Sequence, residues 1–165
     1  QYAFQYSNGV FEPLTLFFPH ILGGSSQESL DKNSNLGKAL RKNNIATNQI
    51  NSQLRRVPTY WGDQPLTAPY YAGVICIFLM IFGFIILKAH EKNWLIYLLV
   101  TSVVLSMGSN LEIINNLFFD YLPGYNKFRS VTFIIIISIF SVVLISCLAL
   151  QKFIEKPKKY KDDII

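Results

Sequence analysis

The chain has 165 residues, of which 51% are hydrophobic and 15% aromatic, and its formal net charge is +5. Its mean hydropathy is +0.30, and its apolar residues fall into blocks, which is typical of an integral membrane protein. The two cysteines, Cys76 and Cys147, lie in separate apolar blocks, a spacing that offers neither a disulfide framework nor a metal site.

The leading segment, residues 1–69, opens as a loop at Gln1 without the pattern of a leader peptide, so we expect the chain to be a fragment of a longer protein. Residues 12–26, EPLTLFFPHILGGSS, are apolar but interrupted by two prolines, which predicts that they lie on the membrane surface or cap a bundle. Residues 26–54 are rich in Asn, Gln, Ser and Lys. They fit one or two short helices and equally a disordered excursion.

Three apolar runs follow the leading segment. Residues 70–87 carry no charge over eighteen positions, and a helix of that length reaches about 27 Å, close to the roughly 30 Å of a hydrocarbon core. Residues 131–150 are uncharged over twenty positions, whereas residues 94–107 are apolar for only fourteen and need extension to Leu111. We therefore predict transmembrane helices at 70–88, 94–111 and 130–151.

Lysines predict the orientation of these helices. Seven of them follow the first or the last run, namely Lys88, Lys92, Lys152, Lys156, Lys158, Lys159 and Lys161. An excess of this kind marks the cytoplasmic side, which places the turn 89–93 and the basic tail 152–165 inside and the loops 1–69 and 112–129 outside. The predicted fold is an all-α, polytopic membrane protein fragment with about three transmembrane helices and extracytoplasmic loops with short helices. The predicted location is a membrane, crossed in several passes.

The loop 112–129 combines a helical pattern with a basic end. Leu111, Ile114, Leu117 and Phe118 have helical spacing, which predicts a short surface helix that stops at Pro123 and Gly124. The sequence then places two cations before the last run, Lys127 and Arg129. They fit a contact with a lipid phosphate and equally two side chains that snorkel to the interface.

The segment YWGDQP, residues 60–65, has the composition of a fixed turn. Gly62 permits a sharp turn, Asp63 can accept from amides two residues on, and Pro65 stiffens the exit. Tyr60 and Trp61 fit an interfacial aromatic belt and also the stacking of a sugar ring. We expect this segment to form one wall of an outward-facing cavity, with residues 125–129 on another wall.

Three blocks of the chain resemble successive blocks of the YfhO family of bacterial membrane proteins. They are SNGVFEPLTLFFPHILGGSS, YWGDQPLTAPYYAGV and GSN…FFDYLPGYNKFRSV, and they cover most of the chain except residues 27–54 and the tail. The resemblance implies an architecture similar to the GT-C class of glycosyltransferases and a role in glycosylation of cell-envelope polymers such as lipoteichoic acid. It implies a polyprenyl-phosphate sugar as donor, no further cofactor, and a key acidic residue that lies upstream of this fragment.

Glycosyl transfer from a lipid phosphate requires a base near the acceptor hydroxyl and positive charge near the departing phosphate. The outer carboxylates are those of Glu12, Asp63, Glu112 and Asp120, which form no metal motif, and the outer histidine is His20. The catalytic residue is unknown; Asp63 is a candidate that would orient an acceptor hydroxyl, although an ion pair with Arg129 ranks above that role. The candidate substrate or lipid-phosphate contacts are Lys127, Arg129, Tyr60 and Trp61.

Two other functional classes fit the same sequence. A lipid or polysaccharide transporter should carry ionisable residues within its spans, and the predicted spans lack them. A non-catalytic membrane scaffold predicts the same helices. The expected partners are membrane lipid, a lipid-linked sugar donor and the remaining transmembrane segments of the full-length protein, and no nucleic acid.

Overall fold

The computed structural model describes residues 2–64, 69–127 and 129–155. In these ranges the chain is helical, as predicted for an all-α protein, and its only β pairing is one isolated antiparallel bridge between Gly23 and Tyr60. The α-helices are α1 (Asn35–Lys42), α2 (Thr47–Leu54), α3 (Val74–Ile86), α4 (Ala89–Ser106), α5 (Glu112–Tyr121) and α6 (Ile135–Glu155). The short 3-10 helices are η1 (Tyr2–Tyr6), η2 (Glu12–Leu16), η3 (Gly108–Leu111), η4 (Tyr125–Lys127) and η5 (Val131–Ile134).

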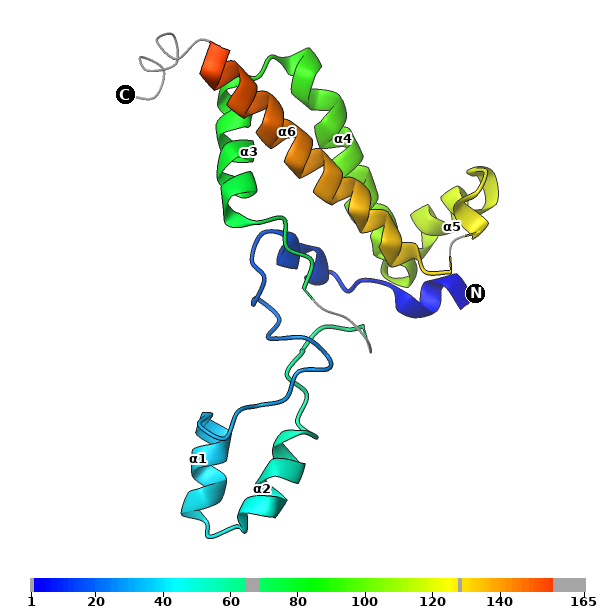
Figure 1. Cartoon of the computed structure of the whole chain (residues 1–165). Helices are drawn as coiled ribbons and strands as arrows, with labels where there is room; N and C mark the ends of the chain where they lie inside the picture. The colour runs from blue at the N-terminus through cyan, green and yellow to red at the C-terminus, as the bar shows by residue number, and fades with distance from the viewer. Residues whose placement is uncertain (1, 65–68, 128, 156–165) are drawn as a thin grey trace.

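Helix α6 is the centre of a three-helix bundle (Figure 1). It packs against both α3 and α4, and these two helices are held together chiefly through it. The buried cluster takes Met80 from α3, Leu95 from α4, and Val142 and Ile145 from α6. These side chains form the apolar core of the bundle.

Small and hydroxyl side chains also make contacts between these helices. The hydroxyls of Ser102 and Ser138 lie 2.6 Å apart between α4 and α6, and Ser146 on α6 donates to the Cys76 carbonyl of α3 at 2.6 Å. At Gly83 the backbone of α3 approaches α6 so closely that a Cβ would lie 2.9 Å from Ile145 Cγ2. Small residues and interhelical hydroxyl bonds are typical of helix pairs that pack in lipid.

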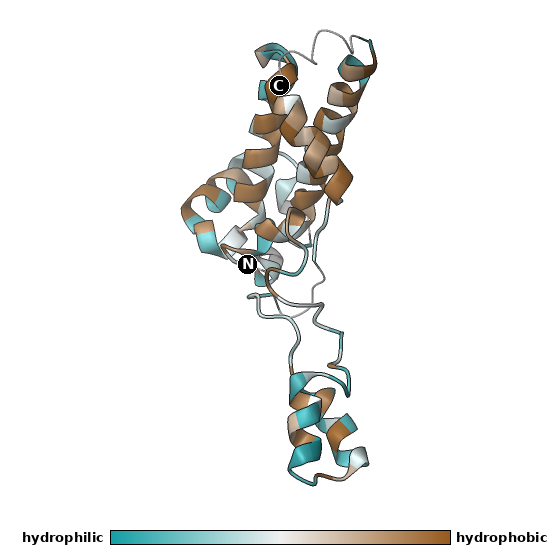
Figure 2. Ribbon diagram, turned by 90° about the vertical axis from the view of Figure 1, so that its left-hand side faces the viewer, coloured by the Kyte–Doolittle hydropathy of each residue, from teal (hydrophilic) through white to brown (hydrophobic). Residues whose placement is uncertain are grey.

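The outer faces of the same helices are strongly apolar (Figure 2). Ile75 is 71% exposed on α3, Tyr97 is 70% exposed on α4, and Ile136 is 68% exposed on α6. An apolar surface that extends over three helices is typical of a surface that contacts a partner or lipid. The outward faces of these helices are therefore more apolar than the interhelical contacts that serine residues make.

One helix in the described part of the chain, Val131–Glu155, is long and apolar enough to cross a membrane, by length and composition. It corresponds to the helix predicted at 130–151 and extends to Glu155. Helix α4 passes the same test only together with residues 108–121, to which it is joined by a bend of 106°, and α3 has thirteen residues. Three full-length spans are therefore not confirmed.

The boundaries of the first two predicted spans are different in the structure. The helix predicted at 70–88 begins after Gly73, whose φ of +94° interrupts the helix, and ends at Ile86. The helix predicted at 94–111 begins at Ala89 because the Glu91 side chain accepts from the Lys88 backbone N–H at 2.8 Å. The predicted turn 89–93 is therefore helical, and Leu87 and Lys88 connect α3 to α4.

The segments outside the three-helix bundle contain the short helices that the sequence predicts. Helix α5 spans Glu112–Tyr121 and stops before Pro123, as expected. It is separated from α4 because Gly108, with a φ of +47°, redirects the chain into η3. Leu16 belongs to the buried cluster of the bundle, and its carbonyl accepts from the Ala72 N–H at 3.1 Å, so the apolar stretch 12–26 caps the bundle next to α3.

Helices α1 and α2 form a hairpin that stands away from the bundle (Figures 1 and 2). The chain segments that lead into and out of this hairpin are paired with each other. The Gly24 N–H donates to the Thr59 carbonyl at 2.9 Å, and the Trp61 N–H donates to the Leu22 carbonyl at 2.9 Å. Of the two alternatives that the sequence left open for residues 26–54, the structure has the two short helices.

The close contact at Gly83 predicts that a β-branched side chain cannot be accommodated there. We expect Gly83→Val to lower the free energy of unfolding in detergent by about 1–3 kcal/mol, because it forces α3 away from α6. The control is Ile85→Val, since Ile85 is 65% exposed on the same helix. Equal stabilities of the two variants would contradict close packing at this point.

Candidate functional site

A buried carboxylate organises the outer end of the molecule. Glu12, at the start of η2, is 2% exposed. Its Oε1 accepts from the Tyr60 hydroxyl and from the Gln64 backbone N–H at 2.9 Å, and its Oε2 accepts from the Gly9 backbone N–H. Burial and the hydrogen bond to Glu12 raise the pKa of the Tyr60 hydroxyl far above its ordinary value, so this group stays a donor.

The hydrogen bonds continue from Glu12 into the bundle. Gln64 Nε2 donates to Asn8 Oδ1 at 2.6 Å, and Asn8 Nδ2 donates to the Ser106 hydroxyl at 3.1 Å at the end of α4. Asn110 Nδ2 donates in turn to the Asn8 carbonyl at 2.8 Å. We call Asn8, Glu12, Tyr60, Gln64 and Ser106 the polar network. It ties together three segments that are far apart in sequence, residues 8–12, 60–64 and 106–110.

Two glycines permit this close approach. A Cβ at Gly62 would clash with the Tyr60 hydroxyl and with Glu12 Oε1, and a Cβ at Gly9 would clash with the Asp63 carboxylate. Residue 62 therefore needs to be a glycine for space, because the atoms beside it belong to the buried polar network. The sequence predicted that Gly62 permits a sharp turn, but neither Gly62 nor Gly9 has a positive φ, so backbone conformation does not require glycine at either position.

The acidic cavity lies beside the polar network and has a volume of about 280 Å³. Its lining includes Phe11, Glu12, Trp61 and Asp63. Trp61 is 75% exposed and Phe11 is 65% exposed, so both rings are available to a ligand. Flat apolar rings next to a carboxylate are suited to a sugar, which presents an apolar face and hydroxyl groups.

The arginine cavity, of about 290 Å³, is lined by Arg129 and by the chain segments that surround it. Its other lining residues are Tyr6, Gln64, Tyr70, Ser130, Thr132 and Phe133. Ser130 and Thr132 are buried, with their hydroxyl oxygens 2.7 Å apart. A guanidinium surrounded by hydroxyl and amide groups is suited to a phosphate.

The structure distributes the predicted site residues over both cavities. Trp61 and Asp63 line the acidic cavity and Arg129 lines the arginine cavity, whereas Lys127 is exposed on η4 and lines neither. Tyr60 is 9% exposed and offers its hydroxyl to Glu12, so its ring is not presented to a ligand in this conformation. Asp63, which lines the acidic cavity, is followed directly in the chain by Gln64, which lines the arginine cavity.

The ion pair with Arg129 that was predicted for Asp63 is not formed. Both residues lie in the part of the chain that the structure describes, and the Asp63 carboxylate lies against Gly9. The inward turn of the Gln64 side chain toward Asn8 separates Asp63 from the cavity that Arg129 lines. Asp63 is thereby left facing the acidic cavity.

The remaining candidates lie outside the two cavities. Glu112 and Asp120 on α5 and His20 are exposed. Among the described residues, no group of three His, Cys, Asp or Glu side chains could hold a metal ion. Glu12 was predicted as one of four outer acids, whereas Asn8, Gln64 and Ser106 were not predicted as site residues. The sequence pattern that could have indicated Asn8 and Gln64 is a polar residue close to a glycine in otherwise apolar surroundings, as in SNG and GDQ.

A second buried contact holds η4. The Tyr125 hydroxyl donates to Asn115 Oδ1 at 2.8 Å and also lies 3.1 Å from the Leu105 carbonyl. The Tyr125 ring packs edge to face on Phe119, with ring centroids 6.2 Å apart. Burial raises the pKa of Tyr125 to about 12. This residue fixes the segment that carries Lys127 against α4 and α5.

Comparisons with protein-family models, with curated proteins and with solved structures find no match to this chain.

The polar network predicts that Glu12 cannot be replaced by its amide. In Glu12→Gln one oxygen becomes an NH₂ group that faces a backbone or hydroxyl donor, so at least one buried donor loses its acceptor. We expect the free energy of unfolding to fall by about 1–3 kcal/mol, measured by denaturation in detergent followed by Trp fluorescence. Glu112→Gln on the exposed face of α5 is the matched control, and equal stability of both variants would contradict the role of Glu12.

Tyr125 predicts a pH dependence of stability. Its pKa is raised from 10.0 to about 12 in the folded protein, so the unfolded chain loses this proton first as the pH rises. Its contribution to stability is therefore complete below pH 10 and decreases above it. We expect the stability difference between wild type and Tyr125→Phe to shrink from pH 9 to pH 12, in urea titrations at each pH. A difference that is constant over this range would show that Tyr125 is not protected in the folded state.

Proposed function

We propose that the chain is part of a multi-pass protein of the bacterial inner membrane. The apolar exterior of α3, α4 and α6 and their contacts through serine and glycine support this proposal, since lipid solvates the first and favours the second. Helix α3 and the bent pair of α4 and α5 are short for independent spans. The remaining transmembrane segments of the full-length protein would then surround them.

The activity that we propose is glycosyl transfer from a polyprenyl-phosphate sugar on the extracytoplasmic face. The observation that supports this activity is a pair of cavities to which neighbouring residues of the chain contribute. Trp61 and Asp63 line one cavity, and Gln64 and Arg129 line the other. The resemblance of the three sequence blocks to the YfhO family supports the same class, because those blocks contribute every residue of the polar network except Ser106.

In this proposal each cavity has one chemical task. Trp61 stacks on a sugar ring, and the Asp63 carboxylate accepts the proton of the acceptor hydroxyl as its oxygen attacks the anomeric carbon. The bond between that carbon and the phosphate oxygen breaks, and Arg129 stabilises the negative charge that remains on the lipid phosphate.

A non-catalytic scaffold is the alternative that the same fold permits. In a scaffold the polar network has only a structural role, and both cavities are incidental. A transporter is less well supported, because residues 74–86, 94–106 and 131–150 contain no Asp, Glu, Lys, Arg or His. Variants that keep the fold and change one cavity distinguish an enzyme from a scaffold.

The arginine cavity is tested by lipid binding. We expect Arg129→Ala in the full chain to weaken binding of a polyprenyl phosphate about 10- to 100-fold, as for loss of one charge-assisted hydrogen bond, measured by native mass spectrometry. Arg129→Lys should recover only part of the affinity, because the forked geometry is lost. Lys88→Ala removes one positive charge at the other end of the bundle and serves as control. Equal lipid retention by wild type and Arg129→Ala would show that Arg129 does not bind the lipid phosphate.

The acidic cavity is tested by transfer of a labelled hexose from a polyprenyl-phosphate hexose in membranes that contain the full-length protein. Asp63→Asn is expected to lower the transfer rate about 100-fold or more, as for loss of a general base, with unchanged lipid binding. Asp120→Asn on exposed α5 is the matched control. Transfer at the wild-type rate by Asp63→Asn, or no transfer by any protein form, would favour the scaffold.

A further inference from the structure

We propose that the outward apolar face of α5 docks into the membrane interface, between the lipid headgroups and the acyl chains. The inference rests on the membrane location proposed above and is independent of the activity proposed for the two cavities. It concerns a face of the protein that lines neither of them. We call the three residues of this face, Ile113, Leu117 and Tyr121, the apolar stripe.

The apolar stripe follows one line along α5. Its residues are four positions apart, so they project from the same side of the helix. Ile113 is 90% exposed, Leu117 is 57% exposed and Tyr121 is 79% exposed. A cleft of about 190 Å³ beside the stripe is lined by Leu117, Phe118, Tyr121 and Leu122. So much exposed apolar surface on one ten-residue helix is typical of a surface that contacts a partner or lipid.

The other two sides of α5 have different surroundings. Asn115 is fully buried, and the Phe119 ring packs on Phe4 and on Tyr125, with centroids 5.4 and 6.2 Å apart. The third side is polar, and its residues are also four positions apart: Glu112, Asn116 and Asp120. A helix that packs on protein with one side and carries adjacent apolar and polar sides has the pattern of a helix that lies in a membrane interface.

The direction of α5 fits the plane of a membrane. The chain bends by 106° between α4 and residues 108–121, and Figure 1 shows α5 extending sideways from the end of α4. Because α4 crosses the membrane in the proposed topology, α5 then runs nearly parallel to the membrane surface. Tyr121 ends the stripe, and tyrosine is enriched at this depth because its ring is apolar and its hydroxyl is polar.

The charge of α5 indicates the kind of contact. Residues 112–121 include two acids and no Lys or Arg, whereas interfacial helices that bind anionic lipid are rich in basic residues. Attraction to anionic headgroups therefore does not hold α5 at the membrane. The contact depends on burial of the apolar stripe, so we expect it to be insensitive to salt.

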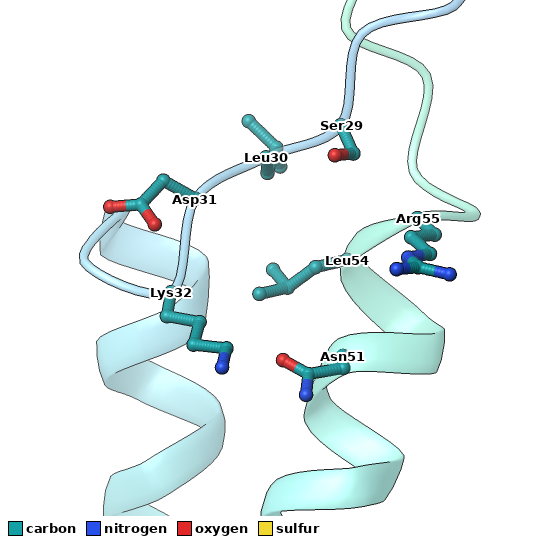
Figure 3. Close-up of a pocket in the computed structure, with 7 residues that line it drawn as sticks. All are labelled: Ser29, Leu30, Asp31, Lys32, Asn51, Leu54 and Arg55. Carbon is teal, nitrogen blue, oxygen red and sulfur yellow. The ribbon is translucent and has the colours of Figure 1, made fainter.

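The α1–α2 hairpin has the opposite character and serves as an aqueous reference. It extends away from the bundle (Figures 1 and 2). Its cavity of about 350 Å³ is lined mainly by polar and charged side chains, among them Asp31, Lys32, Asn51 and Arg55 (Figure 3). A probe at the exposed residue Gln53 on α2 should therefore contact water.

Docking of α5 also fixes the position of η4 relative to the membrane. The Tyr125 hydroxyl donates to Asn115 Oδ1, on the buried side of α5, at 2.8 Å. Lys127 lies on the same short helix as Tyr125. A helix seated in the interface therefore holds η4 at the level of the headgroups.

The test measures the immersion depth of spin labels on the full-length protein in nanodiscs of zwitterionic lipid. Single cysteines are introduced in the Cys76→Ser/Cys147→Ser background. We expect labels on the apolar stripe to be more accessible to dissolved oxygen than to a water-soluble nickel complex, at a depth of about 5–10 Å. These labels are carried by Ile113→Cys, Leu117→Cys and Tyr121→Cys.

Two sets of labels serve as references. Glu112→Cys and Asp120→Cys on the polar side of α5, and Gln53→Cys on the hairpin, should be more accessible to the nickel complex than to oxygen. Tyr97→Cys and Ile136→Cys report on the bundle, where these residues are 70% and 68% exposed. They should show the accessibility of lipid-facing sites.

The bundle labels separate failure of this inference from failure of the membrane location. If they contact lipid while the stripe labels contact water, the inference is wrong and the membrane location stands. The same holds if the stripe labels are shielded from both reagents, because another protein segment then covers the stripe. If the bundle labels contact water, the membrane location is wrong and the inference fails with it.

A second experiment tests what holds α5 in place, with the label at Tyr121→Cys. Ile113→Gln/Leu117→Gln is expected to shift this label toward water, because two apolar side chains no longer favour lipid. The matched control, Glu112→Gln/Asp120→Asn, should leave its depth unchanged, as should high salt. An unchanged depth in the first variant, or a loss of depth in the control or in high salt, would show that the apolar stripe does not hold α5. Circular dichroism verifies that both variants keep their helices.

Discussion

The carboxylate of Glu12 is the group on which the outer half of the molecule depends. Three donors from two distant segments converge on it, and their common acceptor fixes how residues 8–12 lie against residues 60–64. A buried charge is costly unless such donors surround it, so the network is stable only when all its members are in place. The same arrangement forms the acidic cavity. Because the Tyr60 side chain is buried against Glu12, its neighbours Trp61 and Asp63 lie at the surface and line that cavity.

The network also joins two different kinds of packing. On the side of the bundle, α3, α4 and α6 are held by small residues and hydroxyl bonds inside an apolar exterior. Within the network itself, the chain is held by amide and carboxylate groups. Ser106, the last residue of α4, belongs to both, since it is part of the bundle and accepts from Asn8. The outer site is thus attached to a rigid helix end and not only to loops.

The sequence predicted what depends on local pattern. Helix α6, the surface helix α5 and its stop before Pro123 follow from hydrophobic spacing and from proline. The start of α4 was wrong because one side chain, Glu91, extends the helix into a stretch that its charges suggested to be a turn. The burial of Glu12 and the inward turns of Tyr60 and Gln64 were not predictable, because their partners lie 48 and 52 residues away along the chain. The exposure of Trp61 beside Asp63 follows from the same long-range contacts.

The pairing of residues 22–24 with residues 59–61 has a consequence for how this protein can vary. Both ends of the hairpin excursion are closed by backbone bonds next to the polar network, so the excursion is a self-contained insertion. Its length affects the cost of loop closure only weakly. A change in the length of this module can therefore leave the residues on either side in their positions, so the excursion can vary while the adjacent polar network is kept.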